Sequence, residues 1–178
     1  MDALELIGHP VRLRIVHALR GRTLTTAQLH ERLPDVSKAM LYRHVDVLAE
    51  GGILEVAEER RVRGAVERHY RLHQERATID AETAATLTPD DHRRGFSIAL
   101  AALIAEFNAY LDRENADPAT DPVGYRQHAI WLSEAELHAL LADLRAAIVP
   151  PLANEPAPGR TRYLLSPILF PSTEPEDD

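Results

Sequence analysis

The chain has 178 residues, 45% of them apolar and 27% charged, no cysteine, and a formal net charge of −8, a composition typical of a globular protein. Without cysteine there can be no disulfide framework, thiolate zinc site, iron–sulfur cluster or cysteine nucleophile. No apolar run approaches the ~18 residues of a membrane span, and the first residues do not resemble a signal peptide, so we expect a cytoplasmic protein without membrane contact.

Three helices are predicted over the first fifty residues. The first spans 3–20 with a break at 8–10, because the proline there fits the first turn of a new helix. A short second helix covers 25–33 and begins at capping hydroxyls. The third covers 37–50, with Ser37 as N-cap and apolar residues at i, i+4 and i+7. About three residues separate the last two helices, an arrangement typical of a helix-turn-helix.

Alternating apolar and polar residues then predict two strands that form a hairpin over 54–72. Gly64 supplies the positive φ that a hairpin tip needs. Three arginines cluster at this tip: Arg60, Arg61 and Arg63.

The second half is predicted to mix helices and strands. A long helix over 90–114 carries apolar residues spaced by 4, 3, 4 and 3. A strand follows over 125–132, and then a helix that starts with a capping box at Ser133 and ends at Pro150-Pro151. A last strand is expected over 162–170. The long apolar stripe must be buried, and it is the best candidate for a dimer interface.

The charge is distributed unevenly along the chain. Residues 1–76 hold 13 basic and 11 acidic residues, a net of +2, whereas residues 77–178 hold 7 and 17, a net of −10. Such asymmetry indicates a basic interaction surface in one part and another task in the other. The expected organisation is a first domain at 1–76, a connector at 77–89, a second domain at 90–171 and a disordered acidic tail at 172–178.

The first domain carries side chains suited to DNA. Lysine and arginine can donate to guanine or phosphate, and serine and tyrosine can position phosphates. The start of the second helix can hold a phosphate with its free N–H groups, and the hairpin arginines can contact the backbone or minor groove. The candidate DNA-binding residues are Thr25, Thr26, Ser37, Lys38, Tyr42, Arg43, Arg60, Arg61 and Arg63.

Three stretches resemble the winged-helix domain of ArsR-type bacterial transcription regulators: GHPVRLRIV at 8–16, LYRHV at 41–45 and LAEGGIL at 48–54. The resemblance covers roughly residues 4–73. It implies a dimeric, cytoplasmic DNA-binding regulator with 37–50 as recognition helix and 54–72 as wing. The chain lacks the paired cysteines of the metal-sensing members, and its second half is longer than the single dimerisation helix of the smallest members.

The expected fold class is therefore α+β and mainly α, an N-terminal winged helix-turn-helix followed by a C-terminal α/β dimerisation or sensing module. Aromatic residues of that module could line a pocket for a small-molecule effector, although core packing explains them better. These residues are Phe107, Tyr110, Tyr125 and Trp131.

Other functions have less support in the sequence. His92 follows two aspartates, which favours a metal-responsive regulator, but helix capping explains the aspartates better and we expect no metal or other cofactor. There is no nucleophile elbow or glycine-rich phosphate loop, so we expect no enzyme. The leading hypothesis is a homodimeric regulator that binds a pseudo-palindromic site on double-stranded DNA. The alternative is a winged-helix module that binds an acidic partner protein.

Overall fold

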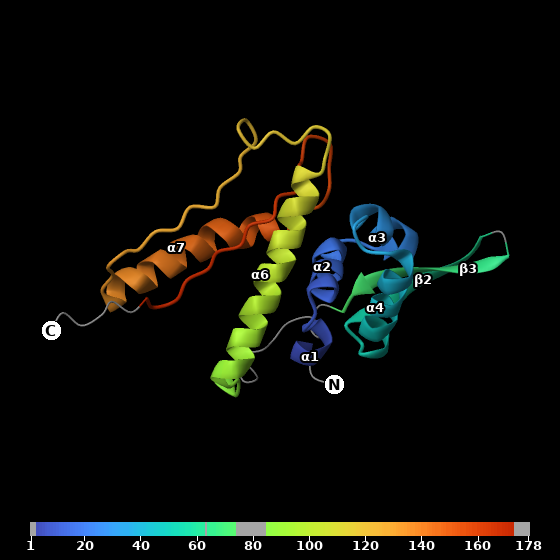
Figure 1. Cartoon of the computed structure of the whole chain (residues 1–178), viewed down its shortest axis with the longest axis horizontal. Helices are drawn as coiled ribbons and strands as arrows, with labels where there is room; N and C mark the ends of the chain where they lie inside the picture. Colours follow the sequence, from blue (N-terminus) through green and yellow to red (C-terminus); the bar gives the residue numbers. More distant parts are fainter. Residues whose placement is uncertain (1–2, 63, 74–84, 173–178) are drawn as a thin grey trace. The chain divides into compact units, whose positions relative to one another are not determined.

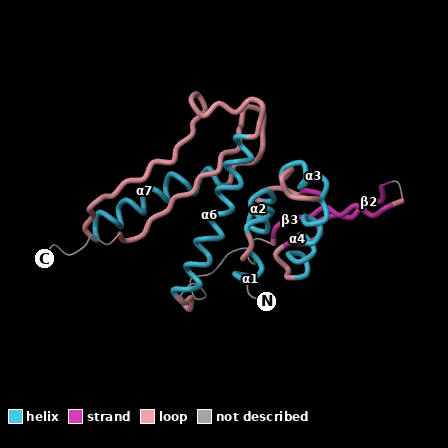
Figure 2. Tube along the Cα trace, viewed as in Figure 1, coloured by secondary structure: helices cyan, strands magenta, loops and turns pink. Residues whose placement is uncertain are grey.

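The computed structural model of the chain describes residues 3–62, 64–73 and 85–172. It divides into two compact units, residues 1–122 and residues 123–178. The described residues form six helices and a small antiparallel sheet (Figures 1 and 2). The predicted class, α+β and mainly α with an N-terminal helix-turn-helix, is confirmed.

Four helices open the first unit: α1 (Ala3–Ile7), α2 (Pro10–Leu19), α3 (Thr26–Arg32) and α4 (Lys38–Glu50). The predicted break between the first two is confirmed. The Nδ1 atom of His9 accepts the Val11 N–H at 3.1 Å, and proline occupies the first position of α2.

The sheet consists of β1 (Leu24–Thr25), β2 (Leu54–Val62) and β3 (Ala65–Leu72) in the order β1-β3-β2, with both pairs antiparallel. The hairpin is confirmed, and Gly64 has a φ of 85° at its tip. The sequence did not indicate β1, because two residues are too few to show the alternation of a strand. It runs directly into α3 and thereby ties the helix-turn-helix to the hairpin.

The core of the first unit lies where α1 to α4 meet the base of the sheet. The apolar faces of these elements close on one another, as amphipathic helices do in a small domain. The most deeply buried side chains include Ile15, Leu19, Leu29, Leu41, Val45, Leu48 and Ile53.

The long helix α6 (Pro89–Leu111) also belongs to the first unit and packs against α2. Thr88 caps it through a capping box with Asp91. The sequence-based organisation instead grouped this helix with the second domain. The expected connector lies largely outside the described residues, which omit 74–84.

The second unit contains α7 (Glu134–Leu152), which starts at the predicted Ser133 cap. The helix ends at Leu152, one residue after the predicted stop at Pro150-Pro151, so both prolines lie in its last turn. Proline fixes φ near the helical value but has no N–H, so neither residue can donate a hydrogen bond to the preceding turn. The carbonyls of both prolines then close the end by accepting the N–H groups of Ala153 and Asn154.

The strands expected at 125–132 and 162–170 are wrong. Neither segment is a strand (Figure 2), and the residues of both are exposed. A strand requires a hydrogen-bonded neighbour, and within the described ranges neither segment belongs to a sheet. The predicted tail lies, apart from Ser172, outside the described residues. Across those ranges no helix combines the length and apolarity needed to span a bilayer.

Candidate nucleic-acid interface

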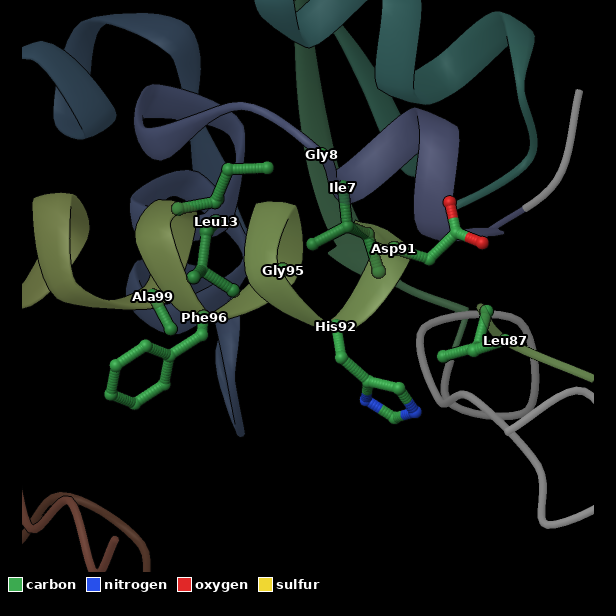
Figure 3. Close-up of a pocket in the computed structure, with 10 residues that line it drawn as sticks. Ile7, Gly8, Leu13, Leu87, Asp91, His92, Gly95, Phe96 and Ala99 are labelled. Atoms are coloured by element: carbon green, nitrogen blue, oxygen red, sulfur yellow. The ribbon is translucent and has the colours of Figure 1, made fainter. Parts of the chain in front are cut away.

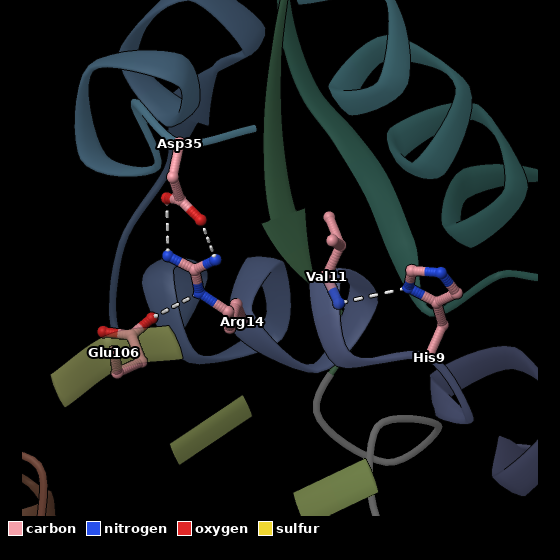
Figure 4. A network of polar contacts seen from close by, with 5 residues as sticks. All are labelled: His9, Val11, Arg14, Asp35 and Glu106. Atoms are coloured by element: carbon pink, nitrogen blue, oxygen red, sulfur yellow. Dashed lines mark hydrogen bonds and ion pairs between the residues drawn. The ribbon is translucent and has the colours of Figure 1, made fainter. Parts of the chain in front are cut away.

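One buried arginine holds the turn between α3 and α4. Arg14 of α2 is 2% exposed and donates two hydrogen bonds to the carboxylate of Asp35 in the turn, at 2.6 and 2.8 Å (Figure 4). Its Nε donates to Glu106 of α6 at 3.3 Å. The planar guanidinium suits this paired geometry, and its hydrogen bonds hold the pKa of Asp35 below the usual value. The turn is thereby fixed to α2 and α6.

Sequence reasoning did not assign Arg14 a role. A signal was present, because Arg14 adjoins Ile15 and lies one helical turn before Ala18, on a face that is otherwise apolar. A charged residue is rarely buried unless it is paired. Nothing in the sequence identified Asp35 and Glu106 as the partners, since Glu106 is 92 positions away.

Helix α4 presents a polar face on the side opposite its core contacts. Leu41, Val45 and Leu48 point inward. The predicted Lys38, Tyr42 and Arg43 are exposed, with Tyr42 at 52%. Residues four apart lie above one another on a helix, so Lys38, Tyr42 and Asp46 form one exposed row. No ion pair engages Lys38 or Arg43 within the described parts of the chain.

Two of the predicted residues, Ser37 and Thr25, act as helix N-caps. The hydroxyl of Ser37 accepts the Met40 N–H at 3.4 Å, although Ser37 itself is exposed. The hydroxyl of Thr25 accepts the Gln28 N–H at 3.2 Å, while the Gln28 side chain accepts the Thr25 N–H at 3.0 Å. Thr25 and Thr26 are 4% and 8% exposed. The structure therefore brings Ser37 to the surface beside Lys38 but leaves both threonines largely covered.

A pair of histidines lies behind the exposed face of α4. The rings of His44 on α4 and His9 at the start of α2 lie against each other at a tilt of 39°, with centroids 4.4 Å apart. Burial, followed by the nearby positive charges of His9, Arg12 and Arg43, lowers the pKa of His44 to about 4. Burial and the same two arginines lower the pKa of His9. His44 is therefore neutral at pH 7 and acts as a packing residue.

The hairpin carries arginines and glutamates in opposed positions. Arg60 pairs with Glu58 of the same strand at 2.7 Å, and two cross-strand pairs, Arg68 with Glu59 and Arg71 with Glu55, lie along the hairpin. Arg61 is exposed, faces Val66 across the ladder, and has no carboxylate partner among the residues that the structure describes. Arg63 lies outside the described residues. The hairpin is thus less basic than its arginines alone suggest.

Known protein families contain this arrangement of a short helix, a tight turn and a helix with an exposed polar face. Residues 7–57 match the family model of a helix-turn-helix domain. The match runs from the end of α1 into β2, so it includes α4 and the turn held by Arg14. Helix-turn-helix domains are characteristic of DNA-binding regulators. No curated protein matches the chain.

A cavity of about 430 Å³ lies between the helix-turn-helix domain and α6 (Figure 3). It is mainly apolar and falls within the first unit. Gly95 faces open space, because a Cβ atom there would meet nothing within 4 Å. Side chains and backbone from α1, α2 and α6 line it, among them Ile7, Gly8, Leu13, Phe96, Ile98 and Ala99.

The four residues predicted to line an effector pocket do not line this cavity. Phe107 and Tyr110 lie together on α6 with ring centroids 5.9 Å apart. The Tyr110 hydroxyl donates to Asp121 at 2.7 Å, and burial together with this carboxylate raises the pKa of Tyr110 to about 12. Tyr125 and Trp131 lie in the second unit and are 83% and 84% exposed. A pocket formed by these four residues stays a prediction.

The histidine and carboxylate groups do not gather into a metal centre in the described parts of the chain, where no cluster of three such side chains occurs. Asp91 accepts hydrogen bonds from the backbone N–H and hydroxyl of Thr88. That capping role accounts for the acidic residue next to His92 without a ligand function.

Proposed function

We propose that the chain is a sequence-specific, DNA-binding transcription regulator that acts in the cytoplasm as a homodimer. The observation that carries the proposal is the exposed polar face of α4, which begins directly after a turn anchored by Arg14 and Asp35. A helix-turn-helix places its second helix in the major groove, and a rigid turn fixes the angle at which that helix enters. The protein needs no cofactor and catalyses no reaction.

Each exposed group of α4 has a proposed task. Lys38 and Arg43, which form no ion pair with any residue that the structure describes, read base edges, since these side chains donate to guanine O6 and N7. Ser37 and Tyr42 contact the phosphates that flank those bases. Arg60, Arg61 and Arg63 of the hairpin contact the sugar–phosphate backbone or the minor groove, as the wing of an ArsR-like regulator. Thr25 and Thr26 contribute through backbone N–H groups at the start of α3.

The proposed dimer uses α6. Two different faces of this helix carry apolar residues. The face toward α2 is built from small residues such as Gly95 and Ala102, which is 1% exposed. The other face carries large residues that remain exposed, with Ile104 at 60% and Phe107 at 37%. A second α6 would cover this stripe. A two-fold dimer implies a pseudo-palindromic operator with half-sites ~34–36 Å apart.

Enrichment of genomic fragments by the purified protein tests the DNA-binding role, with the double variant Lys38→Ala/Arg43→Ala as comparison. Each lost base contact should cost about 1–3 kcal/mol of discrimination, so the variant should lose specific enrichment while it keeps its fold. Tyr163→Ala, an exposed change in the second unit, is the control. Operator affinity that is unchanged in the double variant would refute α4 as the recognition helix.

A protein-interaction module is the alternative function. It predicts that random duplex DNA does not bind even at low salt, and that no genomic fragment is enriched. A salt titration of binding to a random duplex separates the two, because non-specific DNA binding rests on phosphate contacts and weakens steeply with salt.

Regulation by a small apolar effector is favoured by the cavity beside Gly95. Its volume falls within the range of ligand pockets, and it adjoins Gly8, the neighbour of His9, whose ring lies against His44 on α4. Toluene titrated into the protein should shift the methyl NMR signals of Leu13 and Ile98. Gly95→Leu fills the space and should abolish these shifts, whereas the control Gly95→Ala should retain them. Equal shifts in both variants would refute the site.

A further inference from the structure

Four basic residues gather where the start of α2 meets α4. His9 caps α2, and its ring lies against that of His44, with centroids 4.4 Å apart. Arg12 in the first turn of α2 and Arg43 on α4 act on both rings through their positive charge. Among the described residues of α1, α2, α4 and the sheet, no carboxylate acts on either ring in this way. This basic cluster is therefore a site of uncompensated positive potential.

Two members of the basic cluster are covered by protein and lack a hydrogen-bond partner. The Nε atom of Arg12 is buried and meets no acceptor in the described parts of the chain. His44 is only 9% exposed, and within the same parts no hydrogen bond or ion pair engages its imidazole. Buried polar groups are normally hydrogen-bonded, so two unpaired groups at one place indicate that a ligand binds there.

The backbone at the start of α2 adds to the attraction for an anion. The positive end of the helix dipole lies here. The Val11 N–H is bonded to Nδ1 of His9 (Figure 4), whereas the N–H of Arg12 has no partner among the described residues. Because Nδ1 accepts this bond, the proton of a neutral His9 lies on Nε2, which can donate to a ligand.

A phosphate of DNA is the anion that suits this position. Arg43 belongs both to the basic cluster and to the exposed face of α4, so the cluster borders the surface that the proposed function places in the major groove. Phosphates flank that groove, and arginine side chains and helix N-termini are common phosphate ligands. His9 and Arg12 are partly exposed, so a phosphate can reach them.

We propose that His9, Arg12 and His44 bind one backbone phosphate of the DNA that α4 contacts, and that the histidine pair takes up a proton when this phosphate binds. The proposal rests on the DNA binding of the proposed function and adds a contact beside the base-reading face. Arg43 keeps its base contact and contributes only its charge to the site.

The proton uptake follows from the charges around the two rings. In the free chain, burial and the charges of Arg12 and Arg43 hold the pKa of His9 and of His44 below the usual value. A phosphate brings a negative charge that opposes these arginines, and it accepts hydrogen bonds from a protonated imidazole, so it raises the pKa of the pair. The affinity for DNA should therefore increase as the pH falls.

Proton uptake is measured by calorimetric titration of the full chain with a random DNA duplex at pH 7, in two buffers with different ionisation enthalpies. The native chain should take up protons on binding. His9→Asn removes the imidazole but keeps a side chain that can cap α2, and it should lose most of this uptake. His138→Asn, at an exposed position of α7, is the control and should keep the native value.

The salt dependence of binding to the same duplex tests the arginine. Arg12→Gln should reduce the slope of log affinity against log salt concentration by about 1, because one phosphate contact is lost. Arg145→Gln removes an exposed arginine of α7 and should keep the native slope. Far-ultraviolet circular dichroism checks that all four variants keep their helices.

The outcomes distinguish this site from the proposed function. Loss of proton uptake in His9→Asn together with a lower slope in Arg12→Gln supports the phosphate site. A native slope in Arg12→Gln or native uptake in His9→Asn overturns it, and leaves the DNA contacts of α4 in place. If the native chain binds no duplex even at low salt, the proposed function and this contact both fail. Inorganic phosphate that still shifts the imidazole NMR signals of His9 and His44 would then assign the basic cluster to a small anion instead of DNA.

Discussion

The two units of the chain contain similar amphipathic patterns and bury them to opposite degrees. In the first unit Leu29, Leu41 and Leu48 have no exposed surface. In the second unit no described residue is buried, and Leu141 and Leu144 on α7 remain 43% and 37% exposed. The difference is that the helices of the first unit pack on one another and on the sheet, whereas no described element of the second unit buries a face of α7. An apolar stripe in the sequence thus indicates that one face of a helix must be covered, but it does not identify the partner that covers it.

A matched pair of leucine truncations tests this contrast most directly. Leu48→Ala should lower the free energy of unfolding by about 2–5 kcal/mol, because it leaves a cavity in a closed core. Leu144→Ala, on a half-exposed face, should cost far less in a dilute sample where the chain is monomeric. Urea denaturation at low concentration measures both. If Leu144→Ala costs as much as Leu48→Ala under these conditions, the second unit has a core of its own.

Two aspartate-to-alanine changes compare a carboxylate that pairs with a buried arginine and a carboxylate on an exposed helix face. Asp35→Ala leaves the buried Arg14 without its bidentate partner and should destabilise the chain by about 3 kcal/mol, the lower end of the cost of unpairing a buried charge. Asp143→Ala, at an exposed position of α7, should stay within about 0.5 kcal/mol of the native chain. Thermal unfolding followed by circular dichroism measures both, and near-equal effects would show that the Arg14 contact does not hold the turn.

The contact between Arg14 and Asp35 also shows what the sequence could and could not predict. The break before Pro10, the Ser37 cap and the hairpin at Gly64 were predictable because each depends on neighbours within a few residues. The partners of Arg14 are 21 and 92 positions away, and no local pattern encodes such distances.

The errors in the second unit have a related cause. The alternation at 125–132 and 162–170 correctly marks chain that is extended, but a strand exists only when a neighbour accepts its hydrogen bonds. For the candidate site, Lys38, Tyr42 and Arg43 could be placed on the exposed face of α4 from helical spacing alone. The burial of Thr25 and Thr26 could not be predicted in this way, because it depends on β1, a strand of two residues.

The histidine pair in the first unit predicts that stability depends on pH. The pKa of His44 is lowered from 6.5 to about 4 by burial and nearby positive groups, namely Arg12, Arg43 and His9. The unfolded chain therefore binds more protons than the folded chain between these two values, so stability is complete above pH 6.5 and falls as the pH decreases toward 4.

Replacement of the imidazole tests this dependence. In His44→Phe the melting temperature should change less between pH 6.5 and pH 4 than in the native chain. His138→Phe on α7, where the side chain is exposed, is the control and should keep the native slope. A native slope in His44→Phe would show that other groups cause the loss of stability.

The smallest expected effect concerns the hairpin and compares two adjacent arginines. Arg61 has no carboxylate partner among the described residues, whereas Arg60 already pairs with Glu58. Each phosphate contact that is lost should reduce the slope of log affinity against log salt concentration by about 1. Arg61→Gln should therefore flatten the slope on random duplex DNA more than Arg60→Gln, since in the native chain Glu58 competes with DNA for Arg60. Equal slopes would mean that Arg60 leaves Glu58 when DNA binds, and that the ion pairs along the hairpin do not limit its contacts with phosphate.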